Sequence, residues 1–214
     1  MQLPPPLEAN DETAALDLLE CYYGRGAHAH HAPFTGAWFD SWDSTGTRAR
    51  DVNRFTADDL LAVTFLSVAI SAPAARMLLD VHRDAFSQLL AELGPVRDLV
   101  DETERWPEDW AGWRLWQKLV ALPGVGPTRA SKLYARKRPR LRPIYDSVVA
   151  RVTRSTFLWE PLREELQARP ELHTRLVGLG QQIQLPVAVS ALRVFDVVTW
   201  MHGTYGHACP LATQ

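Results

Sequence analysis

The chain has 214 residues, of which 46% are hydrophobic and 22% charged, and its formal net charge is −2 at pH 7. This length and composition predict a globular chain with a sizeable core, in one domain or two small interleaved ones. The apolar stretch at residues 60–70 is too short to cross a bilayer, so we expect no membrane partner. Residues 1–6 lack the layout of a secretory signal, and the two cysteines, Cys21 and Cys209, predict reduced thiols in a cytoplasmic protein.

Helix punctuation recurs along the chain and strand alternation hardly appears, so the sequence predicts an all-α fold. Asn10 is a suitable cap for a first helix through residues 14–19, which should stop near Gly24. Residues 24–53 are rich in Gly, His, Ser and Thr, and we expect irregular structure there.

Thr56 and Asp59 have the spacing of a capping box, which predicts a buried apolar helix at residues 57–70. Pro73 then begins another helix, and a third at 82–93 closes at Gly94. The remaining predicted helices cover residues 108–121, 127–137, 148–152, 161–168, 170–179 and 187–202, the last of them ending at Gly203.

Residues 119–133 join two predicted helices through a Gly-x-Gly turn. Pro123 stops the incoming helix, while Gly124 and Gly126 permit positive φ and leave backbone N–H groups bare. The new helix start at Thr128 adds oriented donors and a positive dipole end. This pattern predicts a helix-hairpin-helix that holds a phosphate oxygen without reading the base sequence. The alternative is a plain tight turn between packed helices.

Charge favours the DNA-binding interpretation. The segment 129–154 holds one acid, Asp146, and nine basic residues, whereas the rest of the chain holds 14 basic and 24 acidic residues. Such segregation is expected of a nucleic-acid binder. The residues predicted to contact duplex DNA are Gly124, Val125, Gly126, Thr128, Arg129, Lys132, Arg136, Lys137, Arg138, Arg140 and Arg142.

These motifs resemble those of a known family. The hairpin at 122–126, a Pro-containing loop and the segment 143–152 are similar to the hairpin and aspartate signature of the DNA base-excision glycosylase superfamily that includes endonuclease III and the adenine glycosylase MutY. Asp146 follows Gly126 by 20 residues, which matches the family's spacing. The match covers about residues 119–152, and the whole chain is also similar to a smaller group of uncharacterised bacterial proteins.

The chain departs from the family at three places. Members that also cleave the strand carry a Schiff-base lysine whose place falls on Thr128, so the resemblance implies no lyase step. The family's glutamine-containing segment, which fills the gap left by a flipped base, corresponds to residues 67–71 and contains no glutamine. Two cysteines cannot hold the four-cysteine iron–sulfur cluster of some members, and we expect no cofactor.

The resemblance implies that Asp146 is catalytic. A carboxylate beside the sugar stabilises the positive charge of glycosidic cleavage and can orient the attacking water, as in a monofunctional hydrolase of base excision repair. Unstacking the base costs a few kcal/mol, which favours damaged or mispaired bases. Tyr145 is a candidate pocket residue and equally a core residue. Asp146 is also a good cap for the following helix, and both roles can hold.

Two other groups of residues have plainer explanations. Trp106, Trp110, Trp113 and Trp116 recur at helical spacing, which is more typical of a core than of a base-stacking surface. His28, His30 and His31, or His202 and His207 with Cys209, lack the compact spacing of a zinc site, so no metal is predicted.

The sequence thus predicts an all-α, helix-hairpin-helix glycosylase-like fold with two helical lobes. One lobe is residues 56–143, with the hairpin at 119–134, and the other is formed by 1–55 plus 144–214. The predicted function is duplex-DNA binding with possible glycosylase chemistry at Asp146. Two alternatives stay open: a non-catalytic DNA-binding module, which the missing glutamine favours, and a helical protein-interaction domain, against which the charge segregation argues.

Overall fold

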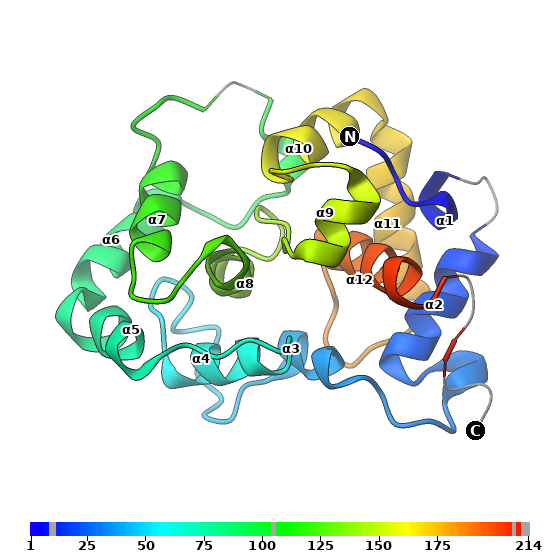
Figure 1. Ribbon diagram of the computed structural model, residues 1–214, viewed down its shortest axis with the longest axis horizontal. Coiled ribbons are helices and arrows are strands. Elements are labelled where there is room, and N and C mark those ends of the chain that lie inside the picture. The colour runs from blue at the N-terminus through cyan, green and yellow to red at the C-terminus, as the bar shows by residue number, and fades with distance from the viewer. Residues whose placement is uncertain (9–11, 104–105, 207–208, 211–214) are drawn as a thin grey trace.

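The computed structural model describes residues 1–8, 12–103, 106–206 and 209–210, and these residues form twelve α-helices and no strand (Figure 1). The predicted all-α class is therefore confirmed. The helices are α1 (Pro5–Glu8), α2 (Thr13–Tyr23), α3 (Trp38–Ser41), α4 (Ala57–Thr64), α5 (Ala72–Arg76), α6 (Arg83–Glu92), α7 (Ala111–Val120), α8 (Pro127–Lys137), α9 (Ser147–Thr153), α10 (Trp159–Ala168), α11 (Pro170–Gln182) and α12 (Ala191–Tyr205).

The helices pack in two groups. In the first, α4 and α7 lie against α8, and α6 lies against α7; in the second, α12 contacts α2, α9 and α11. Figure 1 shows the first group on the left and the second on the right, with both chain ends on the right. Residues 51–53 precede α4 but contact α8 and its end, where Lys137 and Arg138 donate to the carbonyl oxygens of Asp51 and Val52. Residues 51–53, which the sequence assigned to the second lobe, thus pack on α8 of the first group of helices.

Local signals set several helix ends. The capping box at Thr56 is confirmed, since the Asp59 carboxylate accepts a hydrogen bond from the Thr56 amide at 2.9 Å. Gly24 ends α2 in the left-handed region at φ 59°, as predicted. The proposed cap at Asn10 lies outside the described residues.

Several predicted helix ends are wrong by three residues or more, and two of them have a clear physical reason. The helix at 57–70 stops at Thr64, and Ser67 then takes a left-handed φ of 60°, so the chain turns away from the helix axis. At the other end of the chain α12 runs to Tyr205, and Gly203 lies inside the helix. A Cβ at Gly203 would come within 2.6 Å of the Val148 and Val152 side chains, so this glycine permits close packing of α12 on α9.

The segment between α2 and α4 is mostly irregular, as predicted. It contains only the short turns η1 (Gly26–His28) and η2 (Thr35–Ala37) and the four-residue α3. Phe39 anchors this segment in the core at 2% exposure.

The tryptophans of α7 and the segment before it belong to the core. Trp106 stacks on Trp110 with ring centroids 4.5 Å apart, and both contact Trp159 of α10. The Arg142 guanidinium lies 4.0 Å from the ring centres of both Trp116 and Trp159. The prediction that this stripe serves packing rather than base stacking is confirmed.

A disulfide joins Cys21 of α2 to Cys209, 188 residues along the chain. The prediction of reduced thiols is therefore wrong for this structure, because the fold brings both chain ends together around α12. Among the described helices, none combines the length and apolar character that crossing a bilayer requires.

Candidate functional site

A pocket of about 370 Å³ opens where the two groups of helices meet. The segments that line it come from six parts of the chain: α2, the turn at η2, the loop after α4, α8, the start of α9, and α12. Its lining residues are Tyr22, Phe34, Thr35, Gly36, Phe65, Leu66, Ser67, Val68, Thr128, Lys132, Ile144, Asp146, Ser147, Val148, Arg193, Asp196, Val197 and Trp200.

Asp146 lines this pocket and also caps α9. Its Oδ1 accepts hydrogen bonds from the amides of Val148 and Val149, both at 3.0 Å. Its Oδ2 accepts no hydrogen bond from any described residue. The helix start therefore holds one carboxylate oxygen in place while the other remains available to a ligand.

Lys132 is a second charged residue that lines the pocket. It lies one turn after Thr128 on the same face of α8, its side chain is buried, and its Nζ donates to the carbonyl oxygen of Leu66 at 2.8 Å. Burial lowers the pKa of the Lys132 ammonium, while the carboxylates of Asp146 and Asp196 act in the opposite direction.

Arg193 and Asp196 line the pocket from α12. The Arg193 guanidinium pairs with Asp196 and with Asp40 at 2.7 Å, and it donates to the Tyr22 hydroxyl at 3.0 Å and the Gly36 carbonyl at 2.7 Å. Burial raises the pKa of Asp196 to about 7, although Arg193 lowers it. A carboxyl group with such a pKa can give or take a proton near neutral pH.

The predicted hairpin lies at the rim of the pocket through Thr128. Gly124 has the expected positive φ of 73°, but the expectation for Gly126 is wrong, because its φ is −82° with ψ −178°, an extended conformation. Neither glycine amide donates to a described residue. The Val125 amide, in contrast, donates to the Leu122 carbonyl at 2.9 Å, and its side chain is buried, so Val125 is not a phosphate contact.

Arg129 is exposed at the start of α8 and links the hairpin to the loop after α4. Its guanidinium donates to the carbonyl oxygens of Ala69 at 2.9 Å and Gly124 at 3.1 Å. Ser71 adds a bond from its hydroxyl to the Pro123 carbonyl at 3.0 Å. The hairpin and the segment 67–71 are therefore fixed side by side.

The predicted basic DNA surface is wrong for most of its members. Arg136 and Lys137 are buried against Asp59, and the Arg138 guanidinium donates to Asn53 and to backbone carbonyls. Arg142 is also buried, where burial lowers its pKa to about 9. Lys132 faces the pocket rather than a duplex surface.

Arg140 is exposed, but it pairs with Asp98. Acids, carbonyls and aromatic rings distant in sequence thus hold most of the predicted cations inside the fold, and Arg129 is the predicted cation that remains beside the hairpin.

Tyr145 does not line the pocket, contrary to its placement as a pocket candidate. Its backbone is held instead by the Ser131 hydroxyl, which lies 3.1 Å from both the amide and the carbonyl oxygen of Tyr145. Sequence reasoning missed Arg193 and Asp196. Their signal was visible as two charged residues within the apolar run of the last helix, where burial demands a partner.

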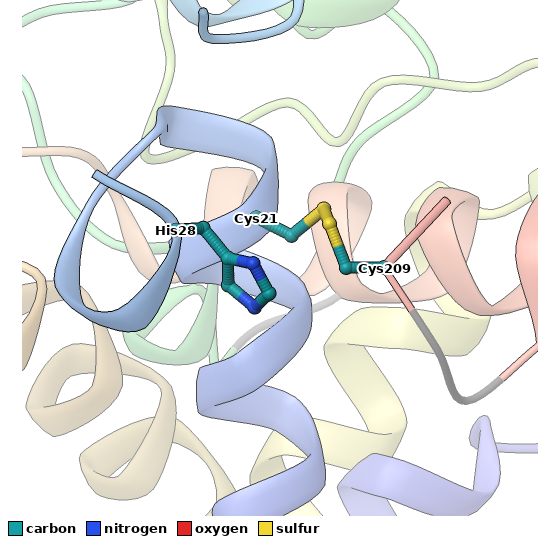
Figure 2. Close-up of side chains that lie close together, drawn as sticks. All are labelled: Cys21, His28 and Cys209. Atoms are coloured by element: carbon teal, nitrogen blue, oxygen red, sulfur yellow. A yellow bond between two sulfur atoms is a disulfide. The ribbon is translucent and has the colours of Figure 1, made fainter. Parts of the chain in front are cut away.

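One group of described side chains has the composition of a metal site. Cys21, His28 and Cys209 offer ligand atoms that all lie within 4.8 Å of one another, and all three are buried (Figure 2). The sequence offered two separate groups of candidate ligands, one containing His28 and the other containing Cys209, and the fold brings these two residues together. His207 lies outside the described residues.

The fold and the site define an all-helical protein with a charged pocket between two groups of helices. Residues 15–203 match the model of the family of unknown function DUF6308, so the chain belongs to that family. No curated protein and no solved structure matches the chain.

Proposed function

We propose that this protein binds duplex DNA and cleaves the N-glycosidic bond of a damaged or modified base. The hairpin holds a backbone phosphate, one nucleotide leaves the duplex, and its base enters the pocket. The observation that carries this proposal is the position of Asp146, at the spacing of the glycosylase aspartate and on the wall of a pocket whose rim includes Thr128 of the hairpin. Since the substrate is DNA, the compartment we propose is the cytoplasm.

The size and lining of the pocket suit a single nucleobase. Its volume of about 370 Å³ lies near the lower end of the range of ligand sites. Tyr22, Phe34 and Trp200 supply aromatic surface on which a planar base can stack. A flipped base needs such a surface, because it gives up its stacking in the duplex.

The charged residues fit hydrolysis. As the bond from C1′ to the base nitrogen breaks, positive charge grows on the sugar, and the Asp146 carboxylate stabilises it and orients a water. The water oxygen forms the new bond to C1′, and its proton passes through the carboxyl groups of the pocket to the leaving base. Asp196, with a pKa raised to about 7 by burial, is suited to that transfer near neutral pH.

The hairpin supplies the phosphate site. The amides of Gly124 and Gly126 and the first turn of α8 present N–H groups at the positive end of a helix dipole, and Arg129 adds a full charge. These contacts position the protein on the backbone and read no bases.

A non-catalytic DNA-binding module is the second candidate. The bonds from Val148 and Val149 to Asp146 Oδ1 favour it, because they give the aspartate a structural role that needs no chemistry.

Base release separates the two candidates. Duplexes carrying alkylated, deaminated, oxidised or mismatched bases are incubated with the parent and with Asp146→Asn, and abasic sites are revealed by alkali. Asparagine keeps the capping oxygen and removes the charge, so we expect release to be lost while the melting temperature changes little. Asp98→Asn, which removes a carboxylate paired with Arg140 away from the pocket, should retain release.

Three results would refute the hydrolase. If the parent releases no base from any duplex of the panel, the non-catalytic module remains as the explanation. If Asp146→Asn releases bases as fast as the parent, the carboxylate has no catalytic role. A covalent protein–DNA adduct trapped by borohydride would show that an amine of the protein acts as a nucleophile, with Lys132 of the pocket the first to substitute, and would overturn the monofunctional scheme.

The hairpin is tested at Gly126. A Cβ there meets nothing within 4 Å and φ is not strained, so Gly126→Val should fold normally while its side chain obstructs an approaching phosphate. We expect DNA affinity to fall at least tenfold. Gly178→Ala on α11, which also meets open space, is the matched control and should bind as the parent does. Unchanged binding of Gly126→Val would place the phosphate elsewhere.

A further inference from the structure

The disulfide between Cys21 and Cys209 lies beside a histidine that takes no part in the pocket. His28 is 7% exposed and belongs to η1, the turn that follows α2 and its Cys21. Figure 2 shows the imidazole directed toward the two sulfurs, and the three ligand atoms lie within 4.8 Å of one another. A disulfide needs no such neighbour, whereas two cysteines and one histidine are a usual ligand set for zinc.

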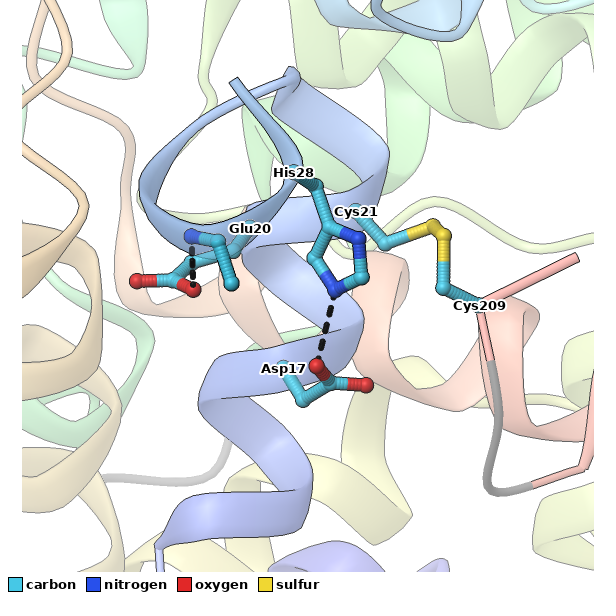
Figure 3. The surroundings of a disulfide bond; sticks show 6 residues. Asp17, Glu20, Cys21, His28 and Cys209 are labelled. Atoms are coloured by element: carbon cyan, nitrogen blue, oxygen red, sulfur yellow. Dashed lines mark hydrogen bonds and ion pairs between the residues drawn. A yellow bond between two sulfur atoms is a disulfide. The ribbon is translucent and has the colours of Figure 1, made fainter. Parts of the chain in front are cut away.

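The orientation of the His28 ring fits a metal ligand. Its Nε2 lies 2.8 Å from Asp17 Oδ1, and Figure 3 shows the other ring nitrogen on the side of the sulfurs. When the carboxylate accepts a hydrogen bond from Nε2–H, the lone pair of the neutral ring is left on Nδ1, toward the cysteines. A carboxylate that orients a histidine in this way is characteristic of zinc sites. This observation is independent of the cysteines.

We propose that the reduced protein binds one Zn²⁺ through Cys21 Sγ, Cys209 Sγ and His28 Nδ1, with a water molecule as the fourth ligand. The chain ends are then linked in two exchangeable ways, by a disulfide under oxidising conditions and by zinc under reducing conditions. This inference does not depend on the glycosylase proposal.

The conversion balances with a thiol reductant. A dithiol passes two electrons and two protons to the disulfide, which yields the two cysteine thiols and leaves the reductant as a cyclic disulfide. Zinc then displaces one proton from each thiol, and two protons go to the solvent. Two thiolates and a neutral imidazole cancel the charge of Zn²⁺, so the loaded site is electrically neutral, as its burial requires.

The geometry needs only a small adjustment. Tetrahedral zinc with bonds of about 2.3 Å to sulfur holds its two sulfurs about 3.8 Å apart. The Cα atoms of Cys21 and Cys209 are 5.7 Å apart, and Cys209 follows the end of α12. Opening the S–S bond therefore requires a shift of the sulfurs by about 2 Å, while Cys21 and His28 stay on one continuous α2–η1 unit.

The site holds two parts of the pocket wall together. Tyr22, which follows Cys21 in α2, lines the pocket and accepts a hydrogen bond from Arg193 of α12, and Cys209 lies just beyond α12. Either link restrains α2 against α12, whereas the reduced, metal-free chain has neither link. We expect its melting temperature to lie below those of both the oxidised and the zinc-loaded protein.

Metal titration of the full chain tests the proposal. The protein is reduced with a trialkylphosphine, which takes up the oxygen of water as it reduces the disulfide, and is freed of metal. Co²⁺ should then bind at one equivalent per chain with a thiolate charge-transfer band and the intense d–d bands of tetrahedral cobalt, and Zn²⁺ should displace it. The oxidised protein should show no such spectrum.

Variants identify the ligands. His28→Ala can be folded as the disulfide form and then reduced, and it should lose at least tenfold in zinc affinity; Asp17→Asn should lose about 10- to 100-fold. Cys21→Ser should lose the thiolate band of a two-sulfur site. His30→Ala, an exposed histidine of the same loop, is the control and should bind normally. Absence of stoichiometric binding in the reduced parent, or full binding by His28→Ala, would overturn the site.

Discussion

Replacing Asp59 by asparagine tests whether the basic residues of α8 are structural. Asp59 is 2% exposed, its Oδ1 lies 3.2 Å from Arg136 Nε, and its Oδ2 lies 2.5 Å from Lys137 Nζ. Asp59→Asn preserves the shape of the side chain but leaves two buried cations without their countercharge. Breaking a buried pair on one side costs about 3–5 kcal/mol.

That cost is large against a typical stability of about 5–15 kcal/mol. For a chain of this size about 1 kcal/mol shifts the melting temperature by about 2–4 °C, so we expect a decrease of about 6–20 °C. Urea and thermal denaturation measure it. Asp98→Asn, which breaks the pair with the half-exposed Arg140, should cost less than about 1 kcal/mol.

The same variant separates a structural from a DNA-binding role. If Arg136 and Lys137 faced a duplex, removing a nearby acid would strengthen DNA binding without destabilising the fold. A loss of less than about 1 kcal/mol in Asp59→Asn, together with tighter DNA binding, would refute the buried network.

Three further predictions follow from burial. Only four of the nine basic residues at 129–154 are exposed. A plot of the logarithm of the DNA-binding constant against the logarithm of the salt concentration should therefore have a slope no steeper than about −4, whereas nine phosphate contacts would give about −8. Fluorescence anisotropy of labelled duplexes measures this slope. Burial raises the pKa of Asp196 in the folded state from 3.8 to about 7, so ionisation of this carboxyl group opposes folding. The stability that the protonated group contributes is complete below pH about 4 and is lost as the pH rises to about 7. Urea denaturation of Asp196→Asn should therefore show a free energy of unfolding that varies less with pH than that of the parent. Gly203→Ala should lower the melting temperature, because its Cβ meets Val148 and Val152, and a melting temperature equal to the parent's would contradict that packing.

The helices were predictable because their signals are local. The capping box at Thr56, the left-handed glycine after α2 and the proline at the start of α8 act within one turn of the chain. The end of α4 was not predictable in this way. Residues 65–70 are as apolar as the helix before them, and the turn at Ser67 is held by contacts to the distant hairpin through Arg129.

The burial of most cations of the basic segment 129–154 was not predictable from the number of charges in it. Asp59 lies 77 residues before Arg136, and the Asp51 carbonyl lies 86 residues before Lys137. A charge count over residues 129–154 includes the cations but not their partners. In the fold, the acid and the carbonyl oxygens that hold Arg136 and Lys137 come from α4 and from the segment before it. The sequence gives no warning of this, because half of the residues at 130–137 are polar or charged although every one of these side chains is buried.

The position of Asp146 was predictable, but the pocket beside it was not. The spacing from the hairpin places the aspartate at the start of α9, while another part of the lining depends on Arg193. This guanidinium joins Asp40, the Tyr22 hydroxyl and the Gly36 carbonyl, which belong to three separate segments of the first part of the chain. A rigid, many-donor cation suits this task, because its planar fork fixes each acceptor in direction as well as distance. The guanidinium that shapes the pocket therefore acts mainly on the protein itself, and the chemistry proposed for the pocket falls to Asp146 and Asp196.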